Sequence, residues 1–166
     1  MTIYWGNIGA GILFTSENQT LLILRSPYIL QPLTWGIPGG SVNLEHEIST
    51  RVMEEAKLDE KEIWEGALRE VEEELGNLPT NLHPYDKLIY RDNNFQFHIY
   101  FVEVPPEIKN IWEMELDDFE VADAKWFNKT TLLNWTELRP LHFGMKYITS
   151  QRPNLFTEKR QRRYQA

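Results

Sequence analysis

Cysteine is absent from this chain of 166 residues. That absence excludes disulfides and thiolate metal sites, and it favours a cytoplasmic protein. The chain also lacks a run of about 18 apolar residues, so we expect no membrane-spanning helix. Its first residues show neither the basic region nor the apolar core of a signal peptide. Basic residues are outnumbered, with 17 Lys and Arg against 25 Asp and Glu. The net charge of −8 therefore argues against a general nucleic-acid binder.

Apolar and aromatic residues are plentiful, because the hydrophobic fraction is 42% and the chain contains 6 Trp, 7 Tyr and 8 Phe. This content predicts one packed domain, which we place at residues 1–152, followed by a polar, basic tail at 153–166. Strands and helices are predicted to alternate, which favours an α/β fold with a mixed sheet flanked by helices. The predicted strands are 3–15, 20–25, 33–37, 85–91, 95–104 and 120–127, and the predicted helices are 44–57, one from about 60 to 75, 130–138 and 141–150.

An acidic segment, Arg-Glu-Val-Glu-Glu-Glu-Leu-Gly at 69–76, is the most informative part of the chain. On a helix, Glu70, Glu73 and Glu74 share one face, where like charges repel unless a cation bridges them. Most acidic helix faces are simply solvated surface. Here the other face is apolar, which predicts a helix packed in a fixed position. That apolar face consists of Ile63, Trp64, Ala67, Leu68, Val71 and Leu75. Asp59 and Glu62 have the spacing of a capping box that begins this helix near Glu60.

Upstream, residues 35–40 read Trp-Gly-Ile-Pro-Gly-Gly, a turn whose glycines allow the backbone to approach a ligand closely. This turn and the acidic segment together resemble the Nudix box. In the family pattern the Arg follows the Gly by fourteen positions, whereas Arg69 lies 29 positions after Gly40. We therefore predict an insertion of about fifteen residues, at about 44–60. The middle Glu of the pattern has no match in register, and its last hydrophobic position is Asn77.

The resemblance implies an α/β/α sandwich and hydrolysis of a diphosphate linkage in a nucleoside diphosphate derivative. It also implies Mg²⁺ as the cofactor, with Mn²⁺ as a substitute. Hard cations of this kind prefer oxygen ligands. By the same resemblance, Glu70, Glu73 and Glu74 and the carbonyl of Gly40 are the metal ligands. Arg69 is expected to orient the carboxylates through paired hydrogen bonds.

A further Glu, outside the box, often serves family members as a ligand or general base. The position that we predict for this role is Glu120, which precedes a late strand ending at Trp126-Phe127. Glu115 is the second choice. A surface charge in a loop is an equally good interpretation of either residue.

The substrate itself is predicted less sharply. Trp35, Arg25 and Gly39 are our predicted substrate-binding residues. Aromatic rings that could stack on a base are Trp35, Trp5, Tyr28 and Phe97, although such residues more often belong to the core. Arg25 and Arg91 could contact phosphate, but exposed arginine is the more common outcome.

Two alternatives to an active hydrolase follow from the same residues. In one, the interrupted box belongs to a non-catalytic Nudix-like module that binds a nucleotide or a protein. The other, the isoprenoid diphosphate isomerase branch, needs a catalytic cysteine and is set aside. The expected partner is a small nucleotide substrate, with a homodimer left open. The basic side chains of the tail are interpreted either as an anion-binding segment or as a solubilising end.

Overall fold

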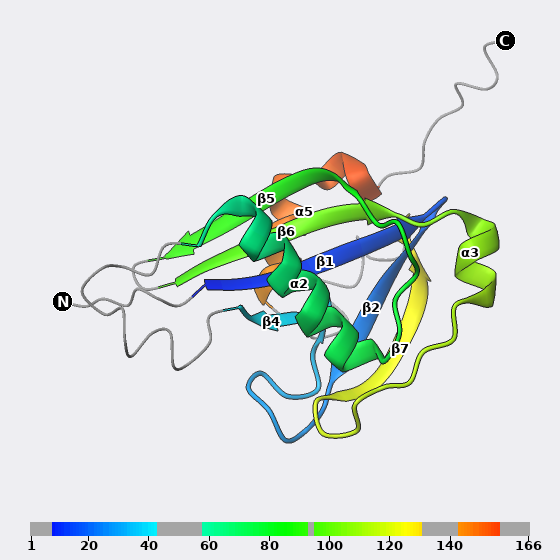
Figure 1. The fold of residues 1–166 in the computed structure, drawn as a ribbon, viewed down its shortest axis with the longest axis horizontal. Helices are drawn as coiled ribbons and strands as arrows, with labels where there is room; N and C mark the ends of the chain where they lie inside the picture. The colour runs from blue at the N-terminus through cyan, green and yellow to red at the C-terminus, as the bar shows by residue number, and fades with distance from the viewer. Residues whose placement is uncertain (1–7, 43–57, 93–94, 131–142, 157–166) are drawn as a thin grey trace, which may run out of the picture.

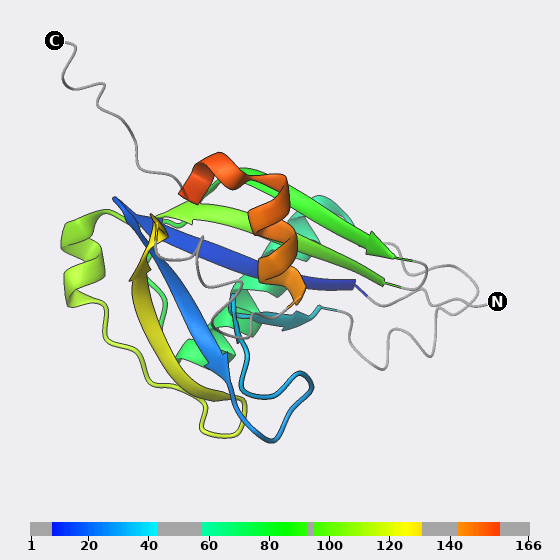
Figure 2. The same cartoon turned by 180° about the vertical axis from the view of Figure 1, so that it is seen from behind.

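The computed structural model describes residues 8–42, 58–92, 95–130 and 143–156. Its centre is a mixed sheet in which the strands follow the order β3-β2-β1-β6-β5, while β4 pairs with β1 and β7 with β2. Helix α2 covers one face of this sheet, and α5 covers the opposite face (Figures 1 and 2). This three-layer arrangement confirms the predicted α/β/α sandwich with a mixed sheet.

The strands agree closely with the predicted ones. Their bounds are Ile8–Ser16 for β1, Gln19–Arg25 for β2, Trp35–Gly36 for β3, Gly39–Ser41 for β4, Pro84–Asp92 for β5, Phe95–Glu103 for β6 and Val121–Asn128 for β7. The sequence did not predict that the glycine turn itself forms a strand. Because β4 is hydrogen-bonded to the beginning of β1, with Gly40 opposite Ala10, the sheet fixes the position of the turn.

Strand β1 is the centre of the sheet and pairs in parallel with β6 along its whole length. Apolar residues alternate along β6 with Gln96, His98 and Tyr100, a pattern that predicts one buried face. In the structure both faces of β6 are buried. Helices cover both faces of the sheet, which removes the need for a polar outer face. The two cores lie on either side of β1 and β6, one under α2 and the other under α5.

Helix α2 runs from Glu60 to Leu75 and begins with the predicted capping box. The side chain of Asp59 accepts a hydrogen bond from the N–H of Glu62 (2.8 Å), and the Glu62 carboxylate accepts one from the N–H of Asp59 (3.0 Å). The helix ends at Gly76, whose φ of 86° suits glycine. A side chain there would collide with the backbone of Glu115.

The remaining helices are short. They are α3 at Pro106–Ile111, α5 at Phe143–Gln151 and a 3₁₀ turn at Pro153–Phe156, whose Phe156 is fully buried against the α5 side of the sheet. The prediction of helix 44–57 and most of the predicted insertion lie outside the described residues, as do most of the predicted helix 130–138 and the tail beyond 156. Within the described part of the chain, no helix combines the length and hydropathy that a membrane span requires.

Candidate functional site

The glycine turn and helix α2 meet at the centre of the predicted site. The N–H of Gly39 donates a hydrogen bond of 2.8 Å to Oε1 of Glu74. Gly39 has a φ of 155°, and a Cβ on it would collide with the backbone of Ala10 and Gly11, so only glycine fits there. A Cβ on Gly40 would lie 2.5 Å from Oε1 of Glu70. Both glycines thus bring bare backbone against carboxylates that are 30 or more positions later in the chain.

Glu74 and Glu70 are the most perturbed acids of the helix. Glu74 is only 4% exposed, and this burial, with the negative charges of Glu120 and Glu70, raises its pKa to about 8 although the Gly39 hydrogen bond opposes the rise. Burial and the charge of Glu73 raise the pKa of Glu70 to about 7, against the opposing effect of Arg69. Perturbed acids that lie together beside a cavity are typical of functional sites.

Glu120 joins these acids from a different part of the chain. Burial raises its pKa, and the charges of Asp117 and Glu73 add to the effect. The loop that carries it is tied to the end of α2, because the N–H of Asp117 donates to the carbonyl of Glu74 at 3.0 Å. Four carboxylates, those of Glu70, Glu73, Glu74 and Glu120, therefore act on one another electrostatically. We call this group the carboxylate cluster.

Two cationic side chains, those of Arg25 and Arg69, interact with the carboxylate cluster. Arg25, at the end of β2, is half-buried, which lowers its pKa, while Glu74 and Glu120 raise it. Its Nε donates to the carbonyl of Leu30 at 2.8 Å, which fixes its position. Arg69 forms an ion pair with Glu70 at 3.8 Å between Nε and Oε2. That distance exceeds a hydrogen bond, so the predicted paired hydrogen bonds from Arg69 are replaced by a looser electrostatic contact.

The donors present suit a hard divalent cation. The carboxylate cluster offers only oxygen ligands, and Gly40 has no side chain to screen its backbone from Glu70. Burial and mutual repulsion disfavour the charged carboxylates, and a bound dication would reverse both effects. Among the residues that the structure describes, no group of three or more His, Cys, Asp or Glu side chains is already spaced to hold a metal ion.

A cavity of about 290 Å³ adjoins the glycine turn. Two of the three predicted substrate-binding residues, Arg25 and Gly39, line it, and so does Gly40. Part of its wall is aromatic, because Phe95 and Phe97 line it and stack with ring centroids 6.2 Å apart. The cavity is large enough for the flat base of a nucleotide and is mostly apolar.

Trp35, the third predicted substrate-binding residue, lies elsewhere. It is 6% exposed and packs edge-on against Phe127, with centroids 5.0 Å apart. This position favours the core role that the sequence left open. Glu115 is exposed and lies at the end of α2 beside Gly76, so the structure favours Glu120 over Glu115. Arg91 is exposed on β5, and Trp5 lies outside the described residues.

Sequence reasoning missed Asp117 and Phe95. Both belong to segments without a motif, and only the fold shows that Asp117 acts on Glu120 and that Phe95 faces the cavity. The sequence did predict a strand that begins at Phe95. It could not show that the beginning of this strand pairs with the beginning of β1, where Ile8 lies opposite Gln96.

Comparisons with solved structures agree with this architecture. The MutT protein from Methanosarcina mazei Go1 superposes with a TM-score of 0.59 at 18% identity, over 92% of this chain and 96% of that one. The NUDIX domain of Shewanella oneidensis NrtR, in complex with ADP ribose, gives 0.56 at 16% identity, over 92% and 89%. A C. elegans Ap4A hydrolase gives 0.53 at 18% identity, over 79% and 86%. Identities this low establish a shared fold.

Among curated protein sequences, none matches this chain. The sequence profile of the NUDIX domain, however, matches residues 7–150. This span includes the glycine turn, all of α2 and the Glu120 loop, and it contains every residue of the carboxylate cluster. The chain therefore belongs to the NUDIX domain family.

Proposed function

We propose that this protein hydrolyses a diphosphate linkage in a nucleoside diphosphate derivative, with Mg²⁺ or Mn²⁺ as the cofactor. The observation that carries the proposal is the carboxylate cluster, which lies against a glycine turn and beside a cavity with an aromatic wall. Nucleotide sugars, dinucleotides and nucleoside triphosphates all contain such a linkage. Membership of the family and the solved relatives support hydrolysis of a nucleotide derivative.

In this proposal Glu70, Glu73 and Glu74 and the carbonyl of Gly40 hold the metal. When bound, the metal would neutralise phosphoryl charge and lower the pKa of a water molecule. Glu120 lies on a separate loop and has a raised pKa, which suits a base that accepts the proton of the attacking water. The guanidinium of Arg25, between the cavity and the cluster, would bind the anionic phosphate.

The alternative is a binding module that has lost hydrolysis. Such a module would be expected to lack at least one box carboxylate or the glycine contact. Here the three box acids are present, and Glu74 is hydrogen-bonded to Gly39 across the site. This contact favours the hydrolase. A cytoplasmic location and a homodimer remain predictions from the sequence.

A phosphate-release assay tests the proposal. The full-length chain is incubated with a panel of nucleotide sugars, dinucleotides and nucleoside triphosphates, with Mg²⁺, with Mn²⁺ and with chelator. We expect turnover of at least one substrate that stops with chelator. The Glu74→Gln variant should lose more than about 100-fold in kcat, because changing only the partners of metal ligands already costs 10–100-fold.

The matched control is Glu72→Gln, since Glu72 is exposed on the outer side of the same helix. This variant should retain parental turnover. Equal rates in the parent and in Glu74→Gln would remove Glu74 from the mechanism. Nucleotide binding without turnover of any substrate would favour the binding module.

A further inference from the structure

Exposed apolar side chains are concentrated beside the carboxylate cluster. Six large hydrophobic side chains are more than half exposed in the described part of the chain, and four of them belong to two loops next to the site. These four are Tyr28 (69%), Leu30 (83%), Leu33 (51%) and Phe119 (59%). Isolated exposed apolar residues are normal, whereas a group of them in one place marks a binding surface.

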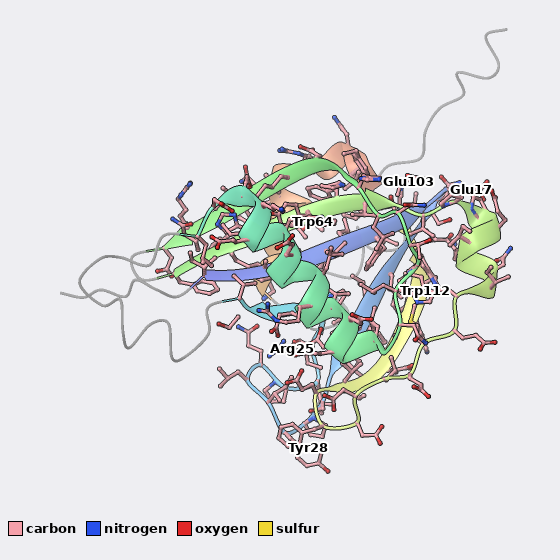
Figure 3. The ribbon with its side chains drawn as sticks, viewed as in Figure 1. Glu17, Arg25, Tyr28, Trp64, Glu103 and Trp112 are labelled. Carbon is pink, nitrogen blue, oxygen red and sulfur yellow. The ribbon has the colours of Figure 1, made fainter. Side chains whose placement is uncertain are left out.

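Two of the four form an ordered pair. The rings of Tyr28 and Phe119 are parallel within 6°, with centroids 5.7 Å apart. We call this pair the aromatic stack. Tyr28 lies on the loop after β2 and Phe119 on the loop before β7, so the stack joins two segments that are 91 positions apart. Figure 3 shows Tyr28 at the outer end of its loop, with Arg25 closer to helix α2.

Backbone contacts hold the stack in place. Ser26 is buried, its hydroxyl donates to the carbonyl of Phe119 at 2.5 Å, and its N–H donates to the carbonyl of Glu120 at 3.0 Å. The same hydroxyl accepts from the N–H of Tyr28 at 3.2 Å. The N–H of Phe119 donates to the Asp117 carboxylate at 2.9 Å. Because both loops are fixed in this way, a ligand ring would bind without the entropic cost of ordering them.

The aromatic stack and the cavity are separate places, because neither Tyr28 nor Phe119 lines the cavity. Phe119 immediately precedes Glu120 of the carboxylate cluster. The loop after β2 borders both places, since its Leu30 lines the cavity and its Tyr28 belongs to the stack. A ligand whose first end fills the cavity and whose phosphates cross the cluster would therefore present its second end near the stack.

We propose that the aromatic stack is a second ring-binding site, which takes a flat aromatic group on the end of the substrate that lies outside the cavity. The proposal rests on the proposed function. A second nucleobase, joined to the first nucleoside through a chain of phosphates, has the required chemistry. Its flat face can stack on Tyr28 or Phe119, whereas a sugar or a bare phosphate offers these rings little.

The test measures binding rather than turnover. Two probes that resist hydrolysis are titrated calorimetrically into the full-length chain with Mg²⁺: methylene-bridged diadenosine tetraphosphate, which has two bases, and methylene-bridged ATP, which has one. Phe119→Ala and Tyr28→Ala should each lower the affinity for the two-base probe by between about 5-fold and 100-fold, the range for base stacking. The one-base probe should change less than about twofold, and Tyr28→Phe should bind both probes like the parent.

Ile111→Ala is the control, because Ile111 is also exposed (71%) but lies on α3. It should bind both probes normally. The proposal is overturned if Phe119→Ala lowers the affinity for both probes equally or for neither. It is also overturned if sedimentation shows that Phe119→Ala converts a parental dimer into a monomer. Failure of the proposed function looks different: the unmodified dinucleotide is not cleaved, although the two-base probe still binds more weakly to Phe119→Ala.

Discussion

The two ends of helix α2 are both acidic, yet their carboxylates lie in opposite environments. At the N-terminal end, Asp59 and Glu62 exchange hydrogen bonds with backbone N–H groups, and Glu60 accepts from Lys87 at 2.7 Å. Towards the C-terminal end, Glu74 is buried and Glu70 is half-buried, each beside other acids. Sequence composition alone would treat the two ends alike.

The difference follows from the helix dipole and from burial. Negative side chains stabilise a helix at its N-terminus and destabilise it at its C-terminus. The last turn of α2 is fully described and contains no basic residue to offset its acids. Acids kept in an unfavourable position are explained by function better than by stability. If one end serves chemistry and the other serves folding, changes at the two ends should affect turnover and stability separately.

Among the changes that probe this comparison, the largest effect is expected from Gly40→Ala, in the glycine turn against Glu70. The new methyl group would lie 2.5 Å from Oε1 of Glu70, which must then rotate away. Because the displaced atoms are the end of a flexible side chain, the stability should change little. If Glu70 holds the metal as proposed, its displacement should lower kcat by about 10–100-fold. Steady-state kinetics with a substrate from the panel, together with thermal unfolding, measures both quantities.

A variant with normal turnover would show that Glu70 does not need its position against the glycine turn. A large loss of stability would instead mean that the turn serves folding, as the capping box does. In either case the contrast between the two ends of α2 would fail.

The contrast also separates what the sequence could predict from what it could not. Helix α2 and its first residue were predicted from local patterns. These are the capping box, the apolar stripe and the shared face of Glu70, Glu73 and Glu74, which follows from the period of 3.6 residues. The strands at 3–15 and 20–25 were predicted from short apolar runs, which are also local patterns. These features depend only on neighbours in the chain.

The surroundings of the helix depend on long-range pairing. Phe95 reaches the cavity because β6 pairs in parallel with β1, and the loop of Asp117 and Glu120 reaches α2 because the N–H of Asp117 donates to the carbonyl of Glu74. Trp35 was predicted to bind substrate, but its sequence context could not show which face of a two-residue strand is buried. Such placements are decided by the fold as a whole.

The next effect, of intermediate size, concerns His98, which lies near the N-terminal end of α2. Burial lowers its pKa to about 4, assisted by the charges of Lys87 and Arg91 and opposed by Glu60. The unfolded chain has a His pKa of about 6.5 and binds the proton first. The contribution of His98 to stability should therefore be fully present above about pH 6.5 and be lost as the pH drops towards 4, whereas the raised pKa values of Glu70 and Glu74 act in the opposite direction over part of this range. Between pH 7 and pH 5 we expect the loss that His98 causes to be on the order of 1–2 kcal/mol.

Urea unfolding at the two pH values measures this loss. On going from pH 7 to pH 5, the parent should lose about 1–2 kcal/mol relative to His98→Gln, whereas His83→Gln, which changes an exposed histidine, should follow the parent. If the parent and His98→Gln change equally between the two pH values, the buried histidine does not contribute to the pH dependence.

The smallest effect is expected from Asp59→Ala at the folding end of the helix. Removing the cap leaves the N–H of Glu62 without its acceptor, which should cost about 1 kcal/mol of stability. The midpoint of thermal unfolding should fall by about 2–4 °C, while kcat and KM stay at parental values. Glu65→Ala, at an exposed position within the helix, should shift the midpoint less. A fall in kcat for Asp59→Ala would mean that the cap also positions the carboxylate cluster, and the two ends of α2 would then act as one unit.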